Sequence, residues 1–483
     1  MNRPMAVLAT ACLGAALFVV PAQATPDSTY VVLYREGASS ANAASAVSQA
    51  GGTLVARYDQ IGVVIARSSR DGFASSLRQN SAVEGVASTA GLGTRVAADQ
   101  DTGTAEVAQA AWGDTLSGLQ WDMKQINVPQ AHAVNAGSRT VVVGDLDTGL
   151  DFTHPDIAPN YDASKSADCS SGAATPLAAG NDQNGHGTHT AGTIAAAANG
   201  TGIVGVAPNV KIAGVKTSND DGFFFPEMVI CAYMWVAAKG INVTNNSYFA
   251  DPWLFNCKND ADQRAIWKAE RRAIRYAQSK GTVVVASEGN ESTDLSHPRV
   301  DVISPDFPPG SEQEREITNA CSVVPVEVPG VVGVTATGNK RFKSYYSSYG
   351  ISTADVAAPG GDRRLQLTAE APNGRVLSTW PSYLGCAIQV TDNGAKFCYL
   401  QGTSMAGPHA AGVAALILSA RGGTAGSVAS QLQTATNPLA CPSDMSIYAP
   451  FPQNSGEPQE CTGGPAHNSF YGSGEIDALK AVS

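Results

Sequence analysis

Three glycine-rich stretches hold the side chains of this sequence that are best suited to covalent chemistry. Ser404 follows a Gly-Thr pair and precedes an apolar, alanine-rich run at residues 410–420 that predicts a buried helix. A serine at a helix N-terminus has free backbone amides beside it, which can stabilise an oxyanion. His186 stands in Asn-Gly-His-Gly-Thr-His, and Asp147 closes an apolar run before Thr-Gly. Because a serine hydroxyl needs a base, and that base an orienting acid, the three residues predict nucleophilic catalysis.

The segments between these stretches alternate apolar strands with helices, and this order predicts how the three side chains are brought together. Continuous apolar strands between helices favour a parallel sheet covered on both faces, an α/β fold. Strands are expected at residues 140–146, 211–215, 241–245, 282–286 and 331–336, and helices at 188–198, 226–239 and 261–278. Ligands of such sheets bind beyond the carboxyl ends of the strands, and Asp147, Ser247 and Asn290 all fall at strand ends.

The three stretches resemble the motifs of the subtilisin-like serine proteases. The similarity rests on Asp-Thr-Gly at residues 147–149, His-Gly-Thr-His-Thr-Ala-Gly at 186–192 and Gly-Thr-Ser-Met-Ala-Gly-Pro-His at 402–409, and it extends over residues 121–479. The resemblance implies a subtilisin-like parallel sheet flanked by helices and a serine endopeptidase acting on protein or peptide substrates. Asp145 shares the strand face of Asp147, but the Thr-Gly that follows favours Asp147 as the acid.

The resemblance also assigns a role to each candidate side chain. Ser404 attacks the scissile carbonyl, His186 carries its proton to the leaving amine, and Asp147 orients His186. Asn290 matches the asparagine that donates to the oxyanion in this family, together with the Ser404 backbone N–H. His189, on the same helix as His186, is expected to have only a structural role.

The segment expected to pair with substrate departs from the family pattern. Ser247-Tyr248-Phe249 stands where the family usually has Ser-Leu-Gly, which places bulk near the first specificity pocket. Glu288 and Glu291 flank Asn290, and they either favour a basic or polar substrate side chain or are merely solvated. A broad endopeptidase, a narrow processing protease and an inactive relative that only binds are therefore the open hypotheses. A lipase of the α/β-hydrolase type is disfavoured, because those chains place the serine in Gly-x-Ser-x-Gly before the acid and histidine.

Calcium is the one cofactor that the resemblance implies, in a structural role, and catalysis requires none. Asp156 lies in the His-Pro-Asp that follows the catalytic aspartate, and Asn199 opens a loop after the histidine helix. In the family these two positions bind calcium together with backbone carbonyls, and such oxygen donors suit a hard cation. The alternative is a loop held by hydrogen bonds alone.

The N-terminal quarter is predicted to be removed during maturation. Residues 1–24 combine a charged start, an apolar run and Ala-Gln-Ala, as in a secretory signal peptide. Residues 25–88 predict a β-α-β-β-α-β order, a small α+β ferredoxin-like unit. Its position implies an inhibitory propeptide, or else an accessory domain. Residues 89–118 are expected to be a linker that contains the maturation site, and residues 119–483 the catalytic domain.

Composition and cysteine usage fit an exported protein. The net charge of −11 disfavours nucleic acid as a partner, and after the signal no apolar run is long enough to cross a membrane. We expect a secreted, extracellular monomer. Eight cysteines remain after the signal, and an even number outside the cytoplasm favours disulfides. Two pairs, Cys386–Cys398 and Cys441–Cys461, could close local loops. The four other cysteines would then pair as Cys257–Cys321 and Cys169–Cys231, although the sequence does not fix this connectivity.

Overall fold

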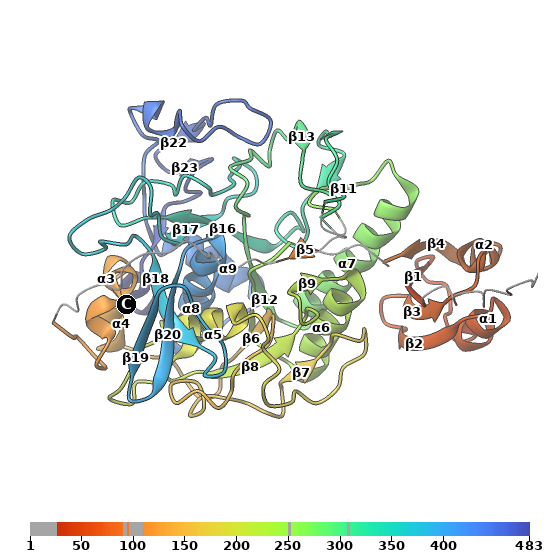
Figure 1. Cartoon of the computed structure of the whole chain (residues 1–483), viewed down its shortest axis with the longest axis horizontal. Helices are drawn as coiled ribbons and strands as arrows, with labels where there is room; N and C mark the ends of the chain where they lie inside the picture. The colour runs from red at the N-terminus through yellow and green to blue at the C-terminus, as the bar shows by residue number, and fades with distance from the viewer. Residues whose placement is uncertain (1–26, 90–93, 96–109, 250–252, 307–309) are drawn as a thin grey trace, which may run out of the picture.

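The structure is a computed structural model in which a large body carries a small unit at one side (Figure 1). It describes residues 27–89, 94–95, 110–249, 253–306 and 310–483. The predicted signal peptide at residues 1–24 and most of the predicted linker lie outside the described residues.

A nine-stranded sheet forms the centre of the large body, in the order β21-β24-β17-β16-β12-β10-β6-β8-β7. All neighbouring pairs are parallel except β21 with β24. The strands are β6 (Val142–Asp147), β7 (Ala167–Asp168), β8 (Lys211–Lys216), β10 (Val243–Asn246), β12 (Val283–Ser287), β16 (Val331–Thr337), β17 (Val356–Pro359), β21 (Thr436–Asn437) and β24 (Glu475–Ile476). The central strands are buried on both faces, which explains why apolar residues predominate in them.

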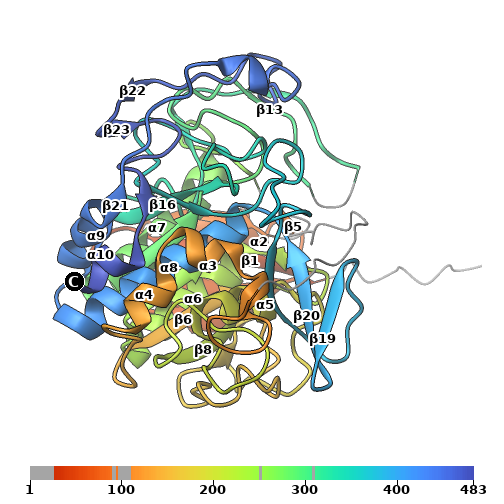
Figure 2. The same ribbon diagram turned by 90° about the vertical axis from the view of Figure 1, so that its left-hand side faces the viewer.

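Helices cover both faces of this sheet, so the predicted α/β fold is confirmed. On one face lie α3 (Trp121–Gln125), α4 (Val128–His132), α5 (His186–Ala195), α8 (Thr403–Arg421), α9 (Ala425–Thr434) and α10 (Ala478–Val482). On the other lie α6 (Pro226–Lys239) and α7 (Ala261–Ser279). Helix α8 is buried along almost its whole length and packs against α5 and five strands of the main sheet (Figure 2).

The small unit has the predicted β-α-β-β-α-β order. Its elements are β1 (Ser28–Tyr34), α1 (Ala43–Gln49), β2 (Thr53–Tyr58), β3 (Val63–Ser68), α2 (Phe73–Arg78) and β4 (Val83–Ser88). The antiparallel sheet, in the order β2-β3-β1-β4, packs through β1 and β4 against α7, and through β1 against α6 (Figure 1). Glu84 on β4 forms ion pairs with Lys268 and Arg272 of α7, which add charge complementarity to this contact.

Short strand pairs and disulfides organise the segments around the main sheet. A three-stranded sheet consists of β18 (Val376–Trp380), β19 (Gln389–Asp392) and β20 (Ala395–Leu400). Two-stranded pairs join β5 (Thr94–Arg95) to β9 (Phe223–Phe224), β11 (Asn256–Cys257) to β15 (Cys321–Ser322), β13 (Val300–Asp301) to β14 (Arg315–Glu316) and β22 (Gly463–Gly464) to β23 (His467–Asn468). Two 3-10 turns complete the elements, η1 (Ser117–Leu119) and η2 (Met445–Tyr448). The four predicted cysteine pairings are all present.

The packed body begins before the end of the predicted linker. Asp114 and the residues of η1 are buried, and the Leu116 N–H donates to the Gly202 carbonyl at 2.7 Å. The Gln120 side chain donates to the Val204 carbonyl at 2.9 Å. These contacts satisfy buried backbone groups, so residues 114–118 belong structurally to the large body rather than to an exposed segment.

Candidate active site

The sheet brings the candidate side chains to its carboxyl edge. Asp147 is the last residue of β6, Ser247 follows β10, and Asn290 lies three residues beyond β12. His186 begins α5, and Ser404 is the second residue of α8. The edge where ligands of parallel sheets bind therefore carries all five residues.

A buried hydrogen bond joins the predicted acid and base. Asp147 Oδ1 lies 2.7 Å from His186 Nδ1, and the side chains are 0% and 3% exposed. The Thr148 backbone N–H also donates to Asp147 Oδ1, at 2.7 Å. The arrangement fixes the ring orientation of His186 and leaves Nε2 as the nitrogen available to a nucleophile.

Ser404 is held beside this pair by Ser247. Ser404 Oγ donates to the Ser247 carbonyl at 3.2 Å, and Ser247 Oγ donates to the Ser404 carbonyl at 3.0 Å. Within the described part of the chain, no hydrogen bond joins Ser404 to His186. Catalytic hydrogen bonds are often long without substrate and tighten in the complex, so this geometry is compatible with a nucleophile that turns toward its base.

Asn290 is oriented by the residue that precedes Ser404. The backbone N–H and the hydroxyl of Thr403 both donate to Asn290 Oδ1, each at 2.9 Å. The two bonds occupy the amide oxygen and leave the Nδ2 donor directed away from Thr403. Nδ2 and the backbone N–H of Ser404 are then the two groups suited to receive a developing oxyanion.

Comparison with known proteins identifies this constellation. The sequence pattern of the subtilase family matches residues 138–474, well over half of the chain. The chain belongs to the subtilase family. The match includes all five residues described above.

Named relatives agree with this membership. Fervidolysin of Fervidobacterium pennivorans is 30% identical over 330 residues, which are 64% of this chain and 38% of that protein. A thermophilic serine proteinase of Bacillus sp. (strain AK1) is 30% identical over 314 residues, covering 64% of this chain and 61% of the relative. This subtilase therefore spans less than two thirds of the length of both relatives.

Solved structures show the same fold. The epidermin leader peptide processing serine protease of Staphylococcus aureus, crystallised as a mutant, has a TM-score of 0.69 at 22% identity, covering 95% of this subtilase and 99% of that chain. The crystal structure of fervidolysin has a TM-score of 0.64 at 22% identity, covering 94% of this chain and 61% of the other.

Of the two glutamates beside Asn290 in this subtilase, Glu288 is buried and Glu291 is half-buried. Glu288 is 1% exposed, accepts a hydrogen bond from Thr353 at 3.1 Å, and has its pKa raised well above the usual range by burial. Glu291 accepts from Ser348 Oγ at 3.2 Å, and burial raises its pKa to about 7. Glu288 is thus a buried core acid that presents no carboxylate to a substrate, so for this residue both the hypothesis of a basic substrate preference and the alternative of a solvated acid are wrong.

Replacing Glu291 with glutamine is expected to remove a pH-dependent loss of stability. The folded-state pKa of Glu291, about 7, lies above the unfolded value of 4.5. The contribution of this carboxyl to stability is therefore fully present below pH 4.5 and is lost as the pH rises to 7. The free energy of unfolding of the variant, relative to that of the parent, should therefore increase by up to roughly 3 kcal/mol as the pH rises from about 5 to about 8. Urea unfolding at both pH values, on a Ser404→Ala background that prevents autolysis, measures this. An equal difference at the two pH values would contradict it.

Two functional neighbours of the site were not predicted from the sequence. Asp182 is fully buried and accepts hydrogen bonds from Thr148 Oγ1 at 2.9 Å, the Gly185 N–H at 2.7 Å and Thr188 Oγ1 at 2.7 Å. It thereby joins the loop after Asp147 to the start of the histidine helix. Thr403 is the other, through its bonds to Asn290. An Asx-rich stretch before His186 is the only sequence signal for Asp182, and it does not reveal partners distant in the chain.

His189 has the structural role that the sequence suggested. It is fully buried, and Nε2 lies 3.0 Å from the Cys398 carbonyl and 3.3 Å from that of Val376. Burial, with a smaller effect of His186, lowers the pKa of His189 to about 3. A neutral imidazole therefore joins α5 to the three-stranded sheet.

The residues proposed to hold calcium lie in contact. Asn199 Nδ2 is 3.2 Å from Asp156 Oδ1, and Asp156 Oδ2 accepts from the Ile203 N–H at 3.0 Å. Asp114 accepts from the Asn199 N–H at 2.8 Å, and Asp392 from the Gly202 N–H at 2.8 Å. Across the described ranges, no group of three or more His, Cys, Asp and Glu side chains could hold a metal ion. The donors are nevertheless oxygens around one loop, which fits a hard cation if the Asn199 amide turns its oxygen inward.

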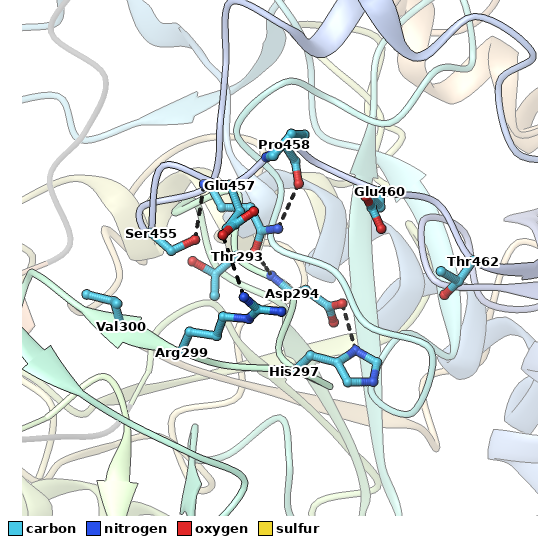
Figure 3. Close-up of a pocket in the computed structure, with 11 residues that line it drawn as sticks. Thr293, Asp294, His297, Arg299, Val300, Ser455, Glu457, Pro458, Glu460 and Thr462 are labelled. Atoms are coloured by element: carbon cyan, nitrogen blue, oxygen red, sulfur yellow. Dashed lines mark hydrogen bonds and ion pairs between the residues drawn. The ribbon is translucent and has the colours of Figure 1, made fainter.

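A polar cavity of about 210 Å³ lies between the segments at residues 293–300 and 453–462 (Figure 3). His297 Nδ1 lies 2.9 Å from Asp294 Oδ2, and Arg299 pairs with Glu457 at 3.5 Å, so most of the charged side chains that line it contact one another.

Among the described residues, no helix is long and apolar enough to cross a membrane.

Proposed function

We propose that the protein is a secreted serine endopeptidase that hydrolyses peptide bonds through a Ser404–His186–Asp147 triad. The buried 2.7 Å hydrogen bond between His186 and Asp147, beside Ser404 at the carboxyl edge of the sheet, is the observation that carries this proposal. Its presence in a subtilase chain supports the assignment, because a third group that orients the base is what distinguishes a triad from a lone histidine.

Each step of the reaction has a residue to perform it. Ser404 Oγ attacks the scissile carbonyl while His186 Nε2 takes its proton, and the electron pair moves to the carbonyl oxygen. Asn290 Nδ2 and the Ser404 N–H stabilise that oxyanion. When the carbonyl re-forms, the C–N bond breaks and His186 gives its proton to the leaving amine. Water then hydrolyses the acyl-enzyme by the same route.

Residues 25–88 are proposed to be an inhibitory propeptide. The unit packs on α6 and α7, and the strand β5 that follows it pairs with β9. Phe224 of β9 stacks on Tyr248 at 4.3 Å, next to Ser247, which holds Ser404. A segment leaving the propeptide is thus carried toward the nucleophile. Because residues 114–118 are packed, we place the maturation site before them, in the segment that starts at residue 89.

Calcium is proposed to stabilise the loop that contains Asn199. If Asp156 and Asn199 hold the ion, added calcium should raise the melting temperature, since a ligand at 100 times its Kd adds about 2.7 kcal/mol. Differential scanning calorimetry of the parent and of Asp156→Ala, each with calcium and with a chelator, measures this. The calcium-dependent increase should vanish in the variant. An increase of the same size in both proteins would contradict the assignment.

Digestion of unfolded casein by the purified protein tests the proposed function, with a serine-directed phosphonate as inhibitor. Hydrolysis that the phosphonate stops supports a broad endopeptidase. Phe249, which is half-buried two residues after the Ser247 that holds Ser404, supports a second candidate, a narrow processing protease. That candidate predicts cleavage of its own precursor with casein left intact. If neither casein nor the precursor is cut, the proposed activity is wrong.

A further inference from the structure

Asp145 is a buried acid beside the triad to which the proposed mechanism gives no task. It lies on β6 two residues before Asp147, on the same face of the strand, and is 2% exposed. Both of its carboxyl oxygens have partners. Asn245 Nδ2 lies 2.8 Å from Oδ1, and Thr190 Oγ1 lies 2.7 Å from Oδ2.

One partner leads to the base. Thr190 stands one helical turn after His186 on α5, and its hydroxyl also lies 3.3 Å from the His186 carbonyl and 3.0 Å from that of Gly187. Contact with Asp145 therefore fixes the first turn of α5 against β6. Helix α5, which carries His186, and strand β6, which carries Asp147, are thus joined by the Thr190–Asp145 bond as well as by the His186–Asp147 hydrogen bond.

The other partner leads to the nucleophile. Asn245 Nδ2 lies 3.1 Å from Ser247 Oγ, and Ser247 Oγ donates to the Ser404 carbonyl at 3.0 Å. That carbonyl is free to accept because its partner in the helix would be the N–H of residue 408, which is proline. A continuous chain of hydrogen bonds thus runs from Asp145 to the backbone of Ser404.

We propose that Asp145 is a positioning residue that connects β6, α5 and α8, and so holds the acid, base and nucleophile in register. The proposal rests on the proposed peptidase function. It assigns Asp145 no contact with substrate, and its effect is exerted through Thr190 and Asn245.

The charge state of Asp145 suits this task. Burial and the neighbouring charge of Asp147, with a smaller effect of Asp182, raise the pKa of Asp145 well above its usual range. The raised pKa favours the form that adds no second negative charge beside the His186–Asp147 pair, and Asp145 Oδ2 accepts from Thr190 Oγ1 at 2.7 Å. Asparagine has the same shape, and its amide can donate to Thr190 Oγ1 while the Thr190 hydroxyl donates to the Gly187 carbonyl, so it should replace Asp145.

The test compares kcat and KM of three variants, each expressed as the full-length precursor and measured after maturation. The concentration of active sites, which kcat requires, is obtained by labelling to completion with a serine-directed phosphonate. Asp145→Leu should lower kcat about 10²-fold, the cost of a displacement of about 1 Å in a catalytic group, and leave KM within about twofold. Asp145→Asn should keep kcat within about threefold. Asp162→Leu is the matched control, because Asp162 is a buried acid paired with Lys211 at the opposite edge of the sheet.

The outcomes separate this role from a merely structural one. Equal kcat losses in Asp145→Leu and Asp162→Leu, or in Asp145→Leu and Asp145→Asn, would overturn the positioning role. If Asp145→Leu does not fold, the isosteric Thr190→Val decides, with a loss of about fivefold in kcat expected and an unchanged kcat as the contrary result. A wild-type precursor that cuts nothing overturns the proposed function itself, and this role with it.

Discussion

Replacing Ser404 with alanine is expected to lower kcat by about six orders of magnitude, the loss known for the triad serine of a subtilisin. The substitution removes the Oγ that forms the acyl bond and keeps the His186–Asp147 hydrogen bond at 2.7 Å. Alanine fits the first turn of α8 without new contacts, so the fold should be retained. Casein hydrolysis by the purified variant, normalised to protein concentration, measures the loss.

The same variant reports on maturation. N-terminal sequencing should find the unit at residues 25–88 still attached, because no peptide bond is cut. Ser419→Ala is the matched control, since Ser419 lies on the same helix, where its hydroxyl donates only to the Ala415 carbonyl at 2.7 Å. A Ser404→Ala protein that digests casein at the wild-type rate would exclude Ser404 as the nucleophile.

Local sequence signals predicted the central fold well. The strand that ends at Asp147 was expected at residues 140–146 and is β6, and the helix expected at 226–239 is α6 with the same bounds. Such segments are predictable because their periodicity and end signals lie within a dozen residues. Cys386–Cys398 and Cys441–Cys461 could be paired for a similar reason, since short loops bring them together.

The start of helix α8 lies well before the apolar run that indicated the helix. The alanine-rich run covers residues 410–420 and Ser404 was expected at the helix N-terminus; the helix begins at Thr403 and continues through Pro408. Proline in a helix interior costs about 3 kcal/mol in an ordinary setting, so it signals a boundary. Here the carbonyl left unbonded by Pro408 accepts from Ser247 instead, and this compensation depends on a residue 157 positions away. The sequence alone could not reveal it.

The contacts that hold the site together could not be predicted from the sequence either, because the residues that make them lie far apart in the chain. Glu288 and Glu291 read as solvated acids because charged side chains are seldom buried unpaired. Glu288 instead meets Thr353, brought near by the parallel pairing of β12, β16 and β17. Raised pKa values make such burial tolerable, since a neutral carboxyl has a smaller desolvation cost. The glycine stretches thus locate the candidate catalytic residues, whereas their supporting partners require the folded chain.

Replacing Asn290 with alanine is expected to lower kcat about 10²–10³-fold, with KM nearly unchanged, a magnitude that comes from the corresponding residue of a subtilisin. The amide contributes only when negative charge develops on the substrate oxygen, so its removal weakens binding of the transition state and not of the ground state.

The structure supplies the reason why Asn290 is ready for this task. Thr403 occupies Oδ1 with two hydrogen bonds of 2.9 Å, so Nδ2 is oriented before substrate binds. Thr403→Val removes the hydroxyl bond and keeps the backbone one, and a smaller loss of about tenfold is expected because a preoriented donor becomes freer to rotate. Steady-state kinetics on a peptide anilide measure both variants. Asn135→Ala is the control, since Asn135 also accepts from a backbone amide, that of Gly137 at 2.8 Å, in the turn before β6. If the loss in Asn290→Ala appears in KM alone, Asn290 binds substrate and does not stabilise the oxyanion.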